Sequence, residues 1–194
     1  ISTPNLFARY FTFNNKSDTL VDNLSEATSH EYYVVQGSGK TIIKNKGRPI
    51  EIKWNKGDVF IIPFTSDKVI HVAFEDQTMF FTVDDSPLVK FLNCKPAECR
   101  FLPCHFKNDD MLKQIDIFNK QDGADKRNRN GILLTTKQMI DEKLNTITHT
   151  MWSLMNSIGP NTVQKPHRHN SIAIDLCTDV DEEASNKGKV YTLM

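Results

Sequence analysis

The chain has 194 residues, enough for one large domain or two small ones. Its 24 Lys and Arg residues balance 24 Asp and Glu residues, so no net field attracts nucleic acid or an anionic membrane. Because it has neither a run of roughly 18 apolar residues nor an N-terminal signal-peptide pattern, we expect a cytoplasmic protein without membrane partners.

The first hundred residues consist of short segments rich in β-branched and aromatic residues, separated by turn formers. Gly37 and Gly57 mark two tight turns, where glycine supplies the positive φ angles that such connections require. Regularly spaced short strands favour an antiparallel sandwich or barrel. The predicted strands are YFTF (10–13), EYYVVQG (31–37), KTIIKN (40–45), IEIKWN (50–55), DVFIIP (58–63), HVAFED (71–76) and TMFFTVDD (78–85).

Three cysteines follow these strands at even spacing, in the run NCKPAECRFLPCH that ends at His105. A zinc site formed by Cys94, Cys99 and Cys104 is one interpretation, but structural zinc sites usually use hooks with two to four residues between the cysteines. Free cysteine is also among the residue types most often buried, and thiols stay reduced in the cytosol. We therefore favour small apolar residues over a zinc site.

A helix is predicted over residues 109–121. Met111, Leu112, Ile115 and Phe118 recur there at helical spacing, and the acidic start suits the positive end of the helix dipole. The sequence upstream shows no helical period. This helix therefore divides a first β-rich region from the C-terminal part of the chain.

The strand pattern resumes after a polar loop, DGADKRNRNG (122–131). GILLTT (131–136) and NTITHTMWSLM (145–155) are the predicted strands, and the second contains Trp152. The chain therefore reads as one complete β-domain, a helical connector and the start of a second β-domain.

The stretch KPHRHNSIAIDL (165–176) carries the main chemical signal. Residues two apart on a strand point to the same side, with Cα atoms roughly 6.6–6.8 Å apart, so His167 and His169 offer both imidazoles to one point while Arg168 faces away. Imidazole is the usual ligand of iron, zinc, copper or nickel. Pro166 suits the first residue of a strand. The alternative is two surface histidines beside an arginine.

The same stretch resembles the first motif of the cupin superfamily, in which a glycine-bearing turn precedes H-x-H on a barrel strand. SHEYYVVQGSGKT (29–41) resembles the rest of that motif, and GDVFIIP (57–63) followed by His71 resembles the second motif. Two such units make a bicupin. With DDSPLVKFL (84–92) between them, the chain resembles gentisate 1,2-dioxygenase-related proteins over nearly its whole length.

The resemblance implies an all-β fold of cupin barrels, each a double-stranded β-helix or jelly roll. Residues 1–105 are expected to form the first barrel, 106–130 a helical connector and loop, and 131–194 the start of a second barrel. On this basis we expect the remaining strands of the second barrel to lie beyond Met194.

The first barrel departs from the cupin pattern at its metal positions. His30 stands where many cupins have glutamate, and the H-x-H positions fall within residues 23–26, which hold no histidine. His71 fits the second motif only with a longer loop. We expect His30 and His71 to face each other, as hydrogen-bonded core residues or as ligand-pocket groups. Since two nitrogens hold a metal poorly, we expect no metal in this barrel.

The second barrel lacks the motif glutamate. Asp175 would point to the same side of the strand as His169. However, it lies six residues further along the chain, roughly 20 Å away on an extended strand. The resemblance then implies a site of histidines alone, as gentisate-type dioxygenases use, with His167 and His169 as metal ligands and a third histidine beyond Met194.

The implied function is that of an Fe(II) dioxygenase acting on a small aromatic hydroxy acid when full-length, with little activity in the 194-residue chain itself. Trp152 is a candidate wall of an aromatic pocket, or a core residue, and no catalytic residue is identified. The alternatives are a non-catalytic small-molecule-binding or structural bicupin and a zinc-dependent isomerase. Because an incomplete barrel exposes apolar faces and strand edges, we expect residues 131–194 to pack against the first barrel or against a second copy in a homo-oligomer.

Overall fold

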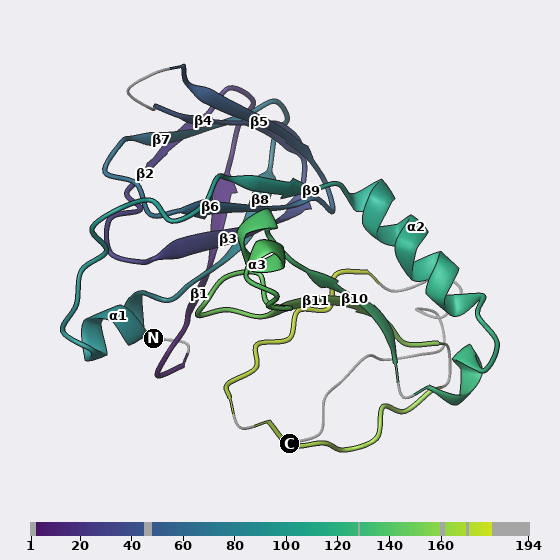
Figure 1. Ribbon diagram of the computed structural model, residues 1–194. Helices are drawn as coiled ribbons and strands as arrows, with labels where there is room; N and C mark the ends of the chain where they lie inside the picture. The colour runs from purple at the N-terminus through teal and green to yellow at the C-terminus, as the bar shows by residue number, and fades with distance from the viewer. Residues whose placement is uncertain (1–2, 45–47, 128, 160–161, 170, 180–194) are drawn as a thin grey trace.

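The structure is a computed structural model that describes residues 3–44, 48–127, 129–159, 162–169 and 171–179 (Figure 1). The first eight strands are β1 (Phe7–Phe13), β2 (Thr19–Asp22), β3 (Ser29–Gln36), β4 (Ser38–Ile43), β5 (Ile50–Asn55), β6 (Val59–Pro63), β7 (Val69–Ala73) and β8 (Thr78–Asp84). The later elements are α1 (Ser86–Phe91), β9 (Cys104–Phe106), α2 (Asn108–Asn119), the 3₁₀ helix η1 (Ala124–Lys126), β10 (Asn130–Leu134), α3 (Lys137–Asp141) and β11 (Ser153–Ser157).

The first eight strands form two antiparallel sheets that enclose one core. One sheet has the order β1-β8-β3-β6, with the later strand β9 added at its β6 edge, and the other has the order β2-β7-β4-β5. This interleaving of the first eight strands is the order of a double-sheet jelly roll, the architecture that cupins use. The predicted jelly-roll barrel is therefore confirmed for this part of the chain.

The barrel core follows from the alternation of buried and partly exposed residues along the strands. β4 and β8 each alternate without a break, which places every second side chain inside. Tyr32 stacks on Phe60 with ring centroids 4.7 Å apart, and Phe80 meets both rings edge-on. The buried interior consists of Phe13, Leu24, Tyr32, Val34, Ile43, Ile52, Trp54, Phe60, Ile62, Val69, Ala73 and Phe80.

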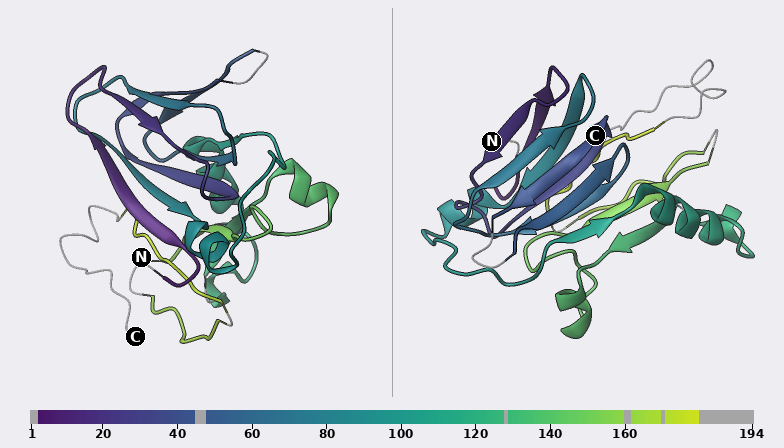
Figure 2. Two further views of the ribbon diagram at one scale, coloured as in Figure 1. Left: turned by 90° about the vertical axis from the view of Figure 1, so that its left-hand side faces the viewer. Right: turned by 90° about the horizontal axis from the view of Figure 1, so that it is seen from above.

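β6 is buried on both faces, because a second layer covers the outside of its sheet. Phe60 and Ile62 point into the barrel, whereas Val59 and Ile61 belong to a separate apolar cluster outside it. Figure 2 shows α2 and the antiparallel pair β10–β11, a hairpin whose long connection contains α3, lying beside the barrel. The outer cluster consists of Val59, Ile61, Met111, Leu134, Ile147 and Met151. The expectation that the region after residue 131 packs against the first barrel is confirmed for this hairpin.

The helix predicted over residues 109–121 is confirmed as α2. Its Met111 and Ile115 are buried, whereas Leu112 is exposed. The sequence missed α1, a short helix with Pro87 in its first turn, because six residues are too few to show a 3.6-residue period. It also missed the four-residue strand β2. None of the described helices is long and apolar enough to cross a membrane.

The long strand predicted over residues 145–155 is wrong in its first part, since only β11 forms. Thr148 supplies the reason, because its Oγ1 accepts hydrogen bonds from the backbone N–H groups of Thr150 (3.3 Å) and Met151 (3.1 Å). A hydroxyl that bonds its own neighbouring backbone favours a turn over a strand ladder.

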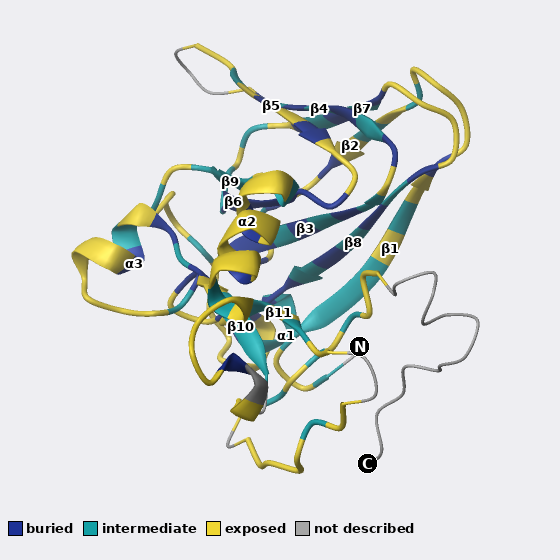
Figure 3. Cartoon of the chain, turned by 90° about the vertical axis from the view of Figure 1, so that its right-hand side faces the viewer, coloured by how far each residue is buried: buried dark blue, intermediate teal, exposed yellow. Residues whose placement is uncertain are grey.

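The strand predicted to carry His167 and His169 is also absent. Residues 162–169 and 171–179 have no regular secondary structure, and Figure 3 shows this region as largely exposed. A strand is stable only when its backbone groups pair with a neighbour. No described strand pairs with this segment, and β10 and β11 pair only with each other among the described strands.

Candidate functional site

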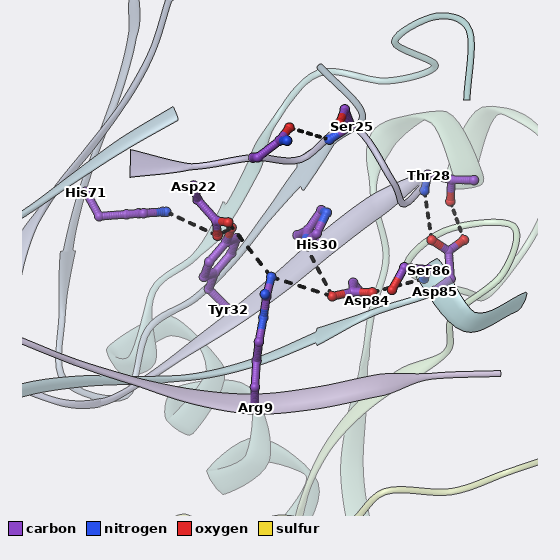
Figure 4. A network of polar contacts seen from close by, with 11 residues as sticks. Arg9, Asp22, Ser25, Thr28, His30, Tyr32, His71, Asp84, Asp85 and Ser86 are labelled. Atoms are coloured by element: carbon purple, nitrogen blue, oxygen red, sulfur yellow. Dashed lines mark hydrogen bonds and ion pairs between the residues drawn. The ribbon is translucent and has the colours of Figure 1, made fainter. Parts of the chain in front are cut away.

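Charged and ring-nitrogen groups gather inside the barrel (Figure 4). They come from five strands: Arg9 on β1, Asp22 on β2, His30 and Tyr32 on β3, His71 on β7 and Asp84 on β8. Register brings them together, since β8 pairs with both β1 and β3, and His30 lies directly opposite Asp84. We call these six residues the barrel cluster.

His71 is fully buried and held from one side by hydrogen bonds. Its Nδ1 lies 2.8 Å from Oγ1 of Thr41, which also accepts a hydrogen bond from Nε1 of Trp54 at 2.9 Å. Its Nε2 lies 3.9 Å from Oδ2 of Asp22. Burial lowers the pKa of His71 to about 4, outweighing the opposite effect of Asp22, while nearby His30 lowers it further. The imidazole is therefore neutral at physiological pH.

His30 is 3% exposed, and its Nδ1 lies 3.6 Å from Oδ2 of Asp84. Burial lowers its pKa as well, against the raising effects of Asp84 and Asp22. Within the described part of the chain, neither ring nitrogen of His30 has a hydrogen-bond partner, and the same is true of Nε2 of His71. Unsatisfied buried polar atoms of this kind are uncommon and call for a physical reason.

Arg9 joins the two carboxylates of the cluster. Its Nη2 lies 3.8 Å from Oδ1 of Asp22 and 3.7 Å from Oδ2 of Asp84. Oδ2 of Asp22 also accepts a hydrogen bond from the Tyr32 hydroxyl at 2.8 Å. Burial, and next the charge of Asp22, raise the pKa of Tyr32 well above its usual range, so the phenol keeps its proton.

The barrel cluster contains the donor types of a metal site, but a protein cation already lies between its carboxylates. Figure 4 shows the Arg9 side chain reaching between Asp22 and Asp84. No group of three His, Cys, Asp or Glu side chains among the described residues is arranged to hold a metal ion. As it stands, the cluster does not fit a divalent metal.

The sequence anticipated part of this cluster. His30 and His71 were predicted to face each other inside the barrel, and both do point into it. Arg9, Asp22 and Asp84 were missed. The alternation of residues along TMFFTVDD could have indicated that Asp84 points into the barrel. No such signal existed for Asp22, because it ends a strand that was not predicted.

His167 and His169 lie outside the barrel cluster and are exposed. Their rings nevertheless meet, with centroids 4.6 Å apart at an interplanar angle of 73°. Nδ1 of His167 lies 3.4 Å from the carbonyl oxygen of Lys165. The predicted strand is wrong, and the two rings contact each other edge to face.

Trp152, the third predicted pocket residue, lies just before β11 and is 51% exposed. Trp152 is therefore not a core residue, which was one of the two roles predicted for it. The cysteine run is dispersed: Cys94 and Cys99 are exposed and Cys104 is half-buried, all as free thiols.

Comparison with known proteins gives matches at the level of structure. No family model matches the chain, and no curated protein does. Solved structures similar to it include salicylate 1,2-dioxygenase from Pseudaminobacter salicylatoxidans, with 20% identity and a TM-score of 0.40 over 50% of this chain and 25% of that one. A structure of that enzyme described as its adducts with gentisate matches with 21% identity and a TM-score of 0.39, over 50% of this chain and 24% of that one.

Oxalate decarboxylase from Bacillus subtilis, a protein with Mn(II) centres, matches with 23% identity and a TM-score of 0.34, over 42% of this chain and 21% of that one. The chain thus spans about a quarter of the length of the structures it matches, or less. Proteins of the kind that the sequence resemblance named are thus among the matches, at sequence identities of 20–23%.

Proposed function

We propose that this chain belongs to a metal-dependent oxygenase of the cupin superfamily, in a bicupin arrangement. Residues 1–105 form the first barrel, 106–130 the connector, and 131–194 the start of a second barrel. The observation that carries the proposal is the pair of imidazoles at His167 and His169, whose ring centroids lie 4.6 Å apart with both rings open to solvent.

The donor chemistry of this pair fits a first-row metal, because imidazole suits iron, zinc, copper and nickel. His167 and His169 would hold the metal, with a further ligand from outside the described residues. Bound Fe(II) would supply the affinity for dioxygen and the charge stabilisation that ring cleavage needs.

The substrate class that we propose is a small aromatic hydroxy acid such as gentisate or salicylate. Trp152 remains the candidate for the wall of its pocket, since a half-exposed indole offers an aromatic face. We also propose a cytoplasmic location, which suits the four free thiols, and a homo-oligomeric state.

Metal binding by the histidine pair is testable in this chain directly. Calorimetric titration with Ni(II) or Co(II) is expected to show weak binding that the double variant His167→Ala/His169→Ala loses. His149→Ala is the matched control, because His149 is exposed and its Nε2 lies 2.6 Å from Oε2 of Glu142. Equal metal binding by the chain and the double variant would remove the pair as a site.

The oxygenase activity is tested with the longest protein that the gene encodes. After anaerobic loading with Fe(II), oxygen uptake is expected with gentisate or salicylate, and little uptake from the 194-residue chain. No uptake across such substrates by the iron-loaded protein would exclude the dioxygenase. Zinc in the protein as purified would favour the isomerase instead.

A non-catalytic bicupin is the second candidate, and one observation favours it. The first barrel is filled by its own side chains, and the Phe80 ring contacts those of Trp54, Tyr32 and Phe60. A filled barrel acts as a scaffold rather than as a ligand chamber. Absence of bound metal in the purified full-length protein would support this function.

A further inference from the structure

We propose that Arg9 is the built-in cation of the first barrel and that its guanidinium keeps divalent metal out of the barrel cluster. The inference concerns the first barrel alone and is independent of the function proposed for His167 and His169. It explains why the cluster combines metal-ligand chemistry with an arrangement that holds no three-ligand group among the described residues.

The ligand types for a metal are present. His71 presents Nε2, and His30 presents both ring nitrogens, without hydrogen-bond partners in the described chain. Asp22 contributes a carboxylate 3.9 Å from His71. Two imidazoles and a carboxylate form a donor set that first-row metals accept. The types of donor atom alone therefore do not explain why the cluster does not fit a divalent metal.

Charge explains it. The cluster holds two carboxylates, from Asp22 and Asp84, and one guanidinium within 3.8 Å of both. Burial keeps the two histidines neutral, so the sum is one negative charge. A divalent ion beside Arg9 would give an excess positive charge and face direct repulsion in a medium of low dielectric constant. Without Arg9, two carboxylates would match one divalent ion.

Arg9 is also held in place, and it cannot relieve the repulsion by losing its proton. The guanidinium carbon lies 4.6 Å from the ring centroid of Phe11 and 5.4 Å from that of Phe7, on the same strand. Only 30% of the side chain is exposed. Strand β1 therefore fixes the cation at the carboxylates, because its alternate positions put Phe7, Arg9 and Phe11 on one face.

Apart from the hydrogen bond that Tyr32 donates to Asp22, the contacts within the cluster are longer than direct hydrogen bonds. The contacts of Arg9 with both carboxylates, of His30 with Asp84 and of His71 with Asp22 measure 3.6–3.9 Å. Each exceeds the usual length of a hydrogen bond. The two carboxylates thus both lie close to the positive charge that Arg9 supplies.

The test removes the charge of Arg9 in a background variant that lacks the exposed histidines His167 and His169, so that any metal binding belongs to the barrel cluster. In His167→Ala/His169→Ala, the variants Arg9→Met and Arg9→Gln remove the charge at similar side-chain length, and Arg9→Lys retains it. Each is titrated with Co(II), followed by visible absorption and by the melting temperature.

Both neutral variants are expected to bind one equivalent of Co(II) at least about 100-fold more tightly than the background, since a like charge within a few ångströms in a protein interior is worth at least that factor. Their melting temperatures should rise with metal. The background and Arg9→Lys should show neither change. Adding His71→Ala or Asp22→Asn to Arg9→Met should abolish the gain.

Three outcomes would overturn the proposal. One is Co(II) binding by the background that depends on His71. Another is a shift of the imidazole NMR signals of His30 or His71 when Zn(II) is added to the background, which retains Arg9 and needs no destabilising change. The third is that both neutral variants stay folded and gain no metal binding.

Discussion

Nε2 of His71 lies 3.9 Å from Oδ2 of Asp22 inside a closed jelly roll, and the histidine is nonetheless neutral. The carboxylate finds its partners elsewhere, in the Tyr32 hydroxyl and the Arg9 guanidinium. Burial therefore has a larger effect on the pKa of His71 than the attraction between the two side chains. This balance makes the stability of the barrel sensitive to acid.

Acidification is expected to destabilise the protein through His71 and His30. Both pKa values are lowered in the folded state, so below the unfolded value of 6.5 the unfolded chain binds more protons. The stability contribution is present above pH 6.5 and lost as the pH falls through about 4. Between pH 7.5 and 5.0, His71 alone should cost on the order of 2 kcal/mol in urea unfolding. His71→Gln should flatten the pH dependence by that amount; an unchanged profile would contradict a neutral buried His71.

Loss of the Tyr32 hydroxyl is expected to destabilise the barrel. Tyr32→Phe leaves Asp22 without a donor that now lies at 2.8 Å, and hydrogen bonds to charged groups are worth about 1.5–3 kcal/mol. The control is Tyr10→Phe, because Tyr10 is more than half exposed on strand β1 of the same sheet. Urea unfolding should separate the two variants clearly. Equal stabilities would mean that the Tyr32–Asp22 bond contributes nothing.

Glu31 carries a charge that the fold disfavours. Burial raises its pKa, and the hydrogen bond that Ser153 donates at 2.6 Å only partly opposes this. The raised pKa means that stability is present below 4.5 and lost as the pH rises through the folded value. Glu31→Gln should therefore increase the free energy of unfolding at pH 7.5 by on the order of 1 kcal/mol, and have little effect at pH 4.

Glu31 makes the protein more stable as the pH falls, whereas His30 and His71 make it less stable. The pH dependence of the stability of His71→Gln is therefore best measured in the Glu31→Gln background as well. A loss of stability at pH 7.5 in Glu31→Gln would show instead that the carboxylate is stabilised where the hairpin meets the barrel. Ser153→Ala provides the matched control, since it removes the same hydrogen bond from the other side.

Gly39 is required by close packing at the end of β4. A Cβ there would lie 2.2 Å from the carbonyl oxygen of Val72 and 2.3 Å from the Trp54 ring. Gly39→Ala should cost about 1–3 kcal/mol, the usual range for overpacking, and lower the melting temperature. Gly159→Ala is the control, because its nearest contact would be Oγ1 of Thr162 at 3.3 Å. Similar melting temperatures for the two variants would show that Trp54 can shift without cost.

The barrel was predictable from sequence because its signals are local. Alternating apolar residues in 31–37 and 78–85 correspond to β3 and β8, and Gly37 and Gly57 both adopt φ of 86° as predicted for tight turns. The period of α2 was equally clear. These features depend on residues close together in the chain.

The features that were not predictable depend on pairing between distant residues. Asp22 and Asp84 become neighbours of His71 and His30 only when β2, β3, β7 and β8 take their places, and Arg9 enters from a further strand. The segment around His167 has a local signal for a strand but lacks the pairing with distant residues that a strand requires. Its apolar run suits a strand, but strand character needs a partner, and none pairs with it among the described residues.

The register of β1 on β8 has a consequence for how the chain acquires its shape. Phe7 pairs with Asp84, so the sheet closes only when the first and last strands of the barrel are both available. Such non-local pairing is slow, because the entropy of a long loop is lost before the contacts form. During synthesis the N-terminal strand must wait, unpaired, for β8 to emerge from the ribosome. The hairpin β10–β11 finds its docking surface only afterwards, which imposes a sequential order of assembly from the barrel outwards.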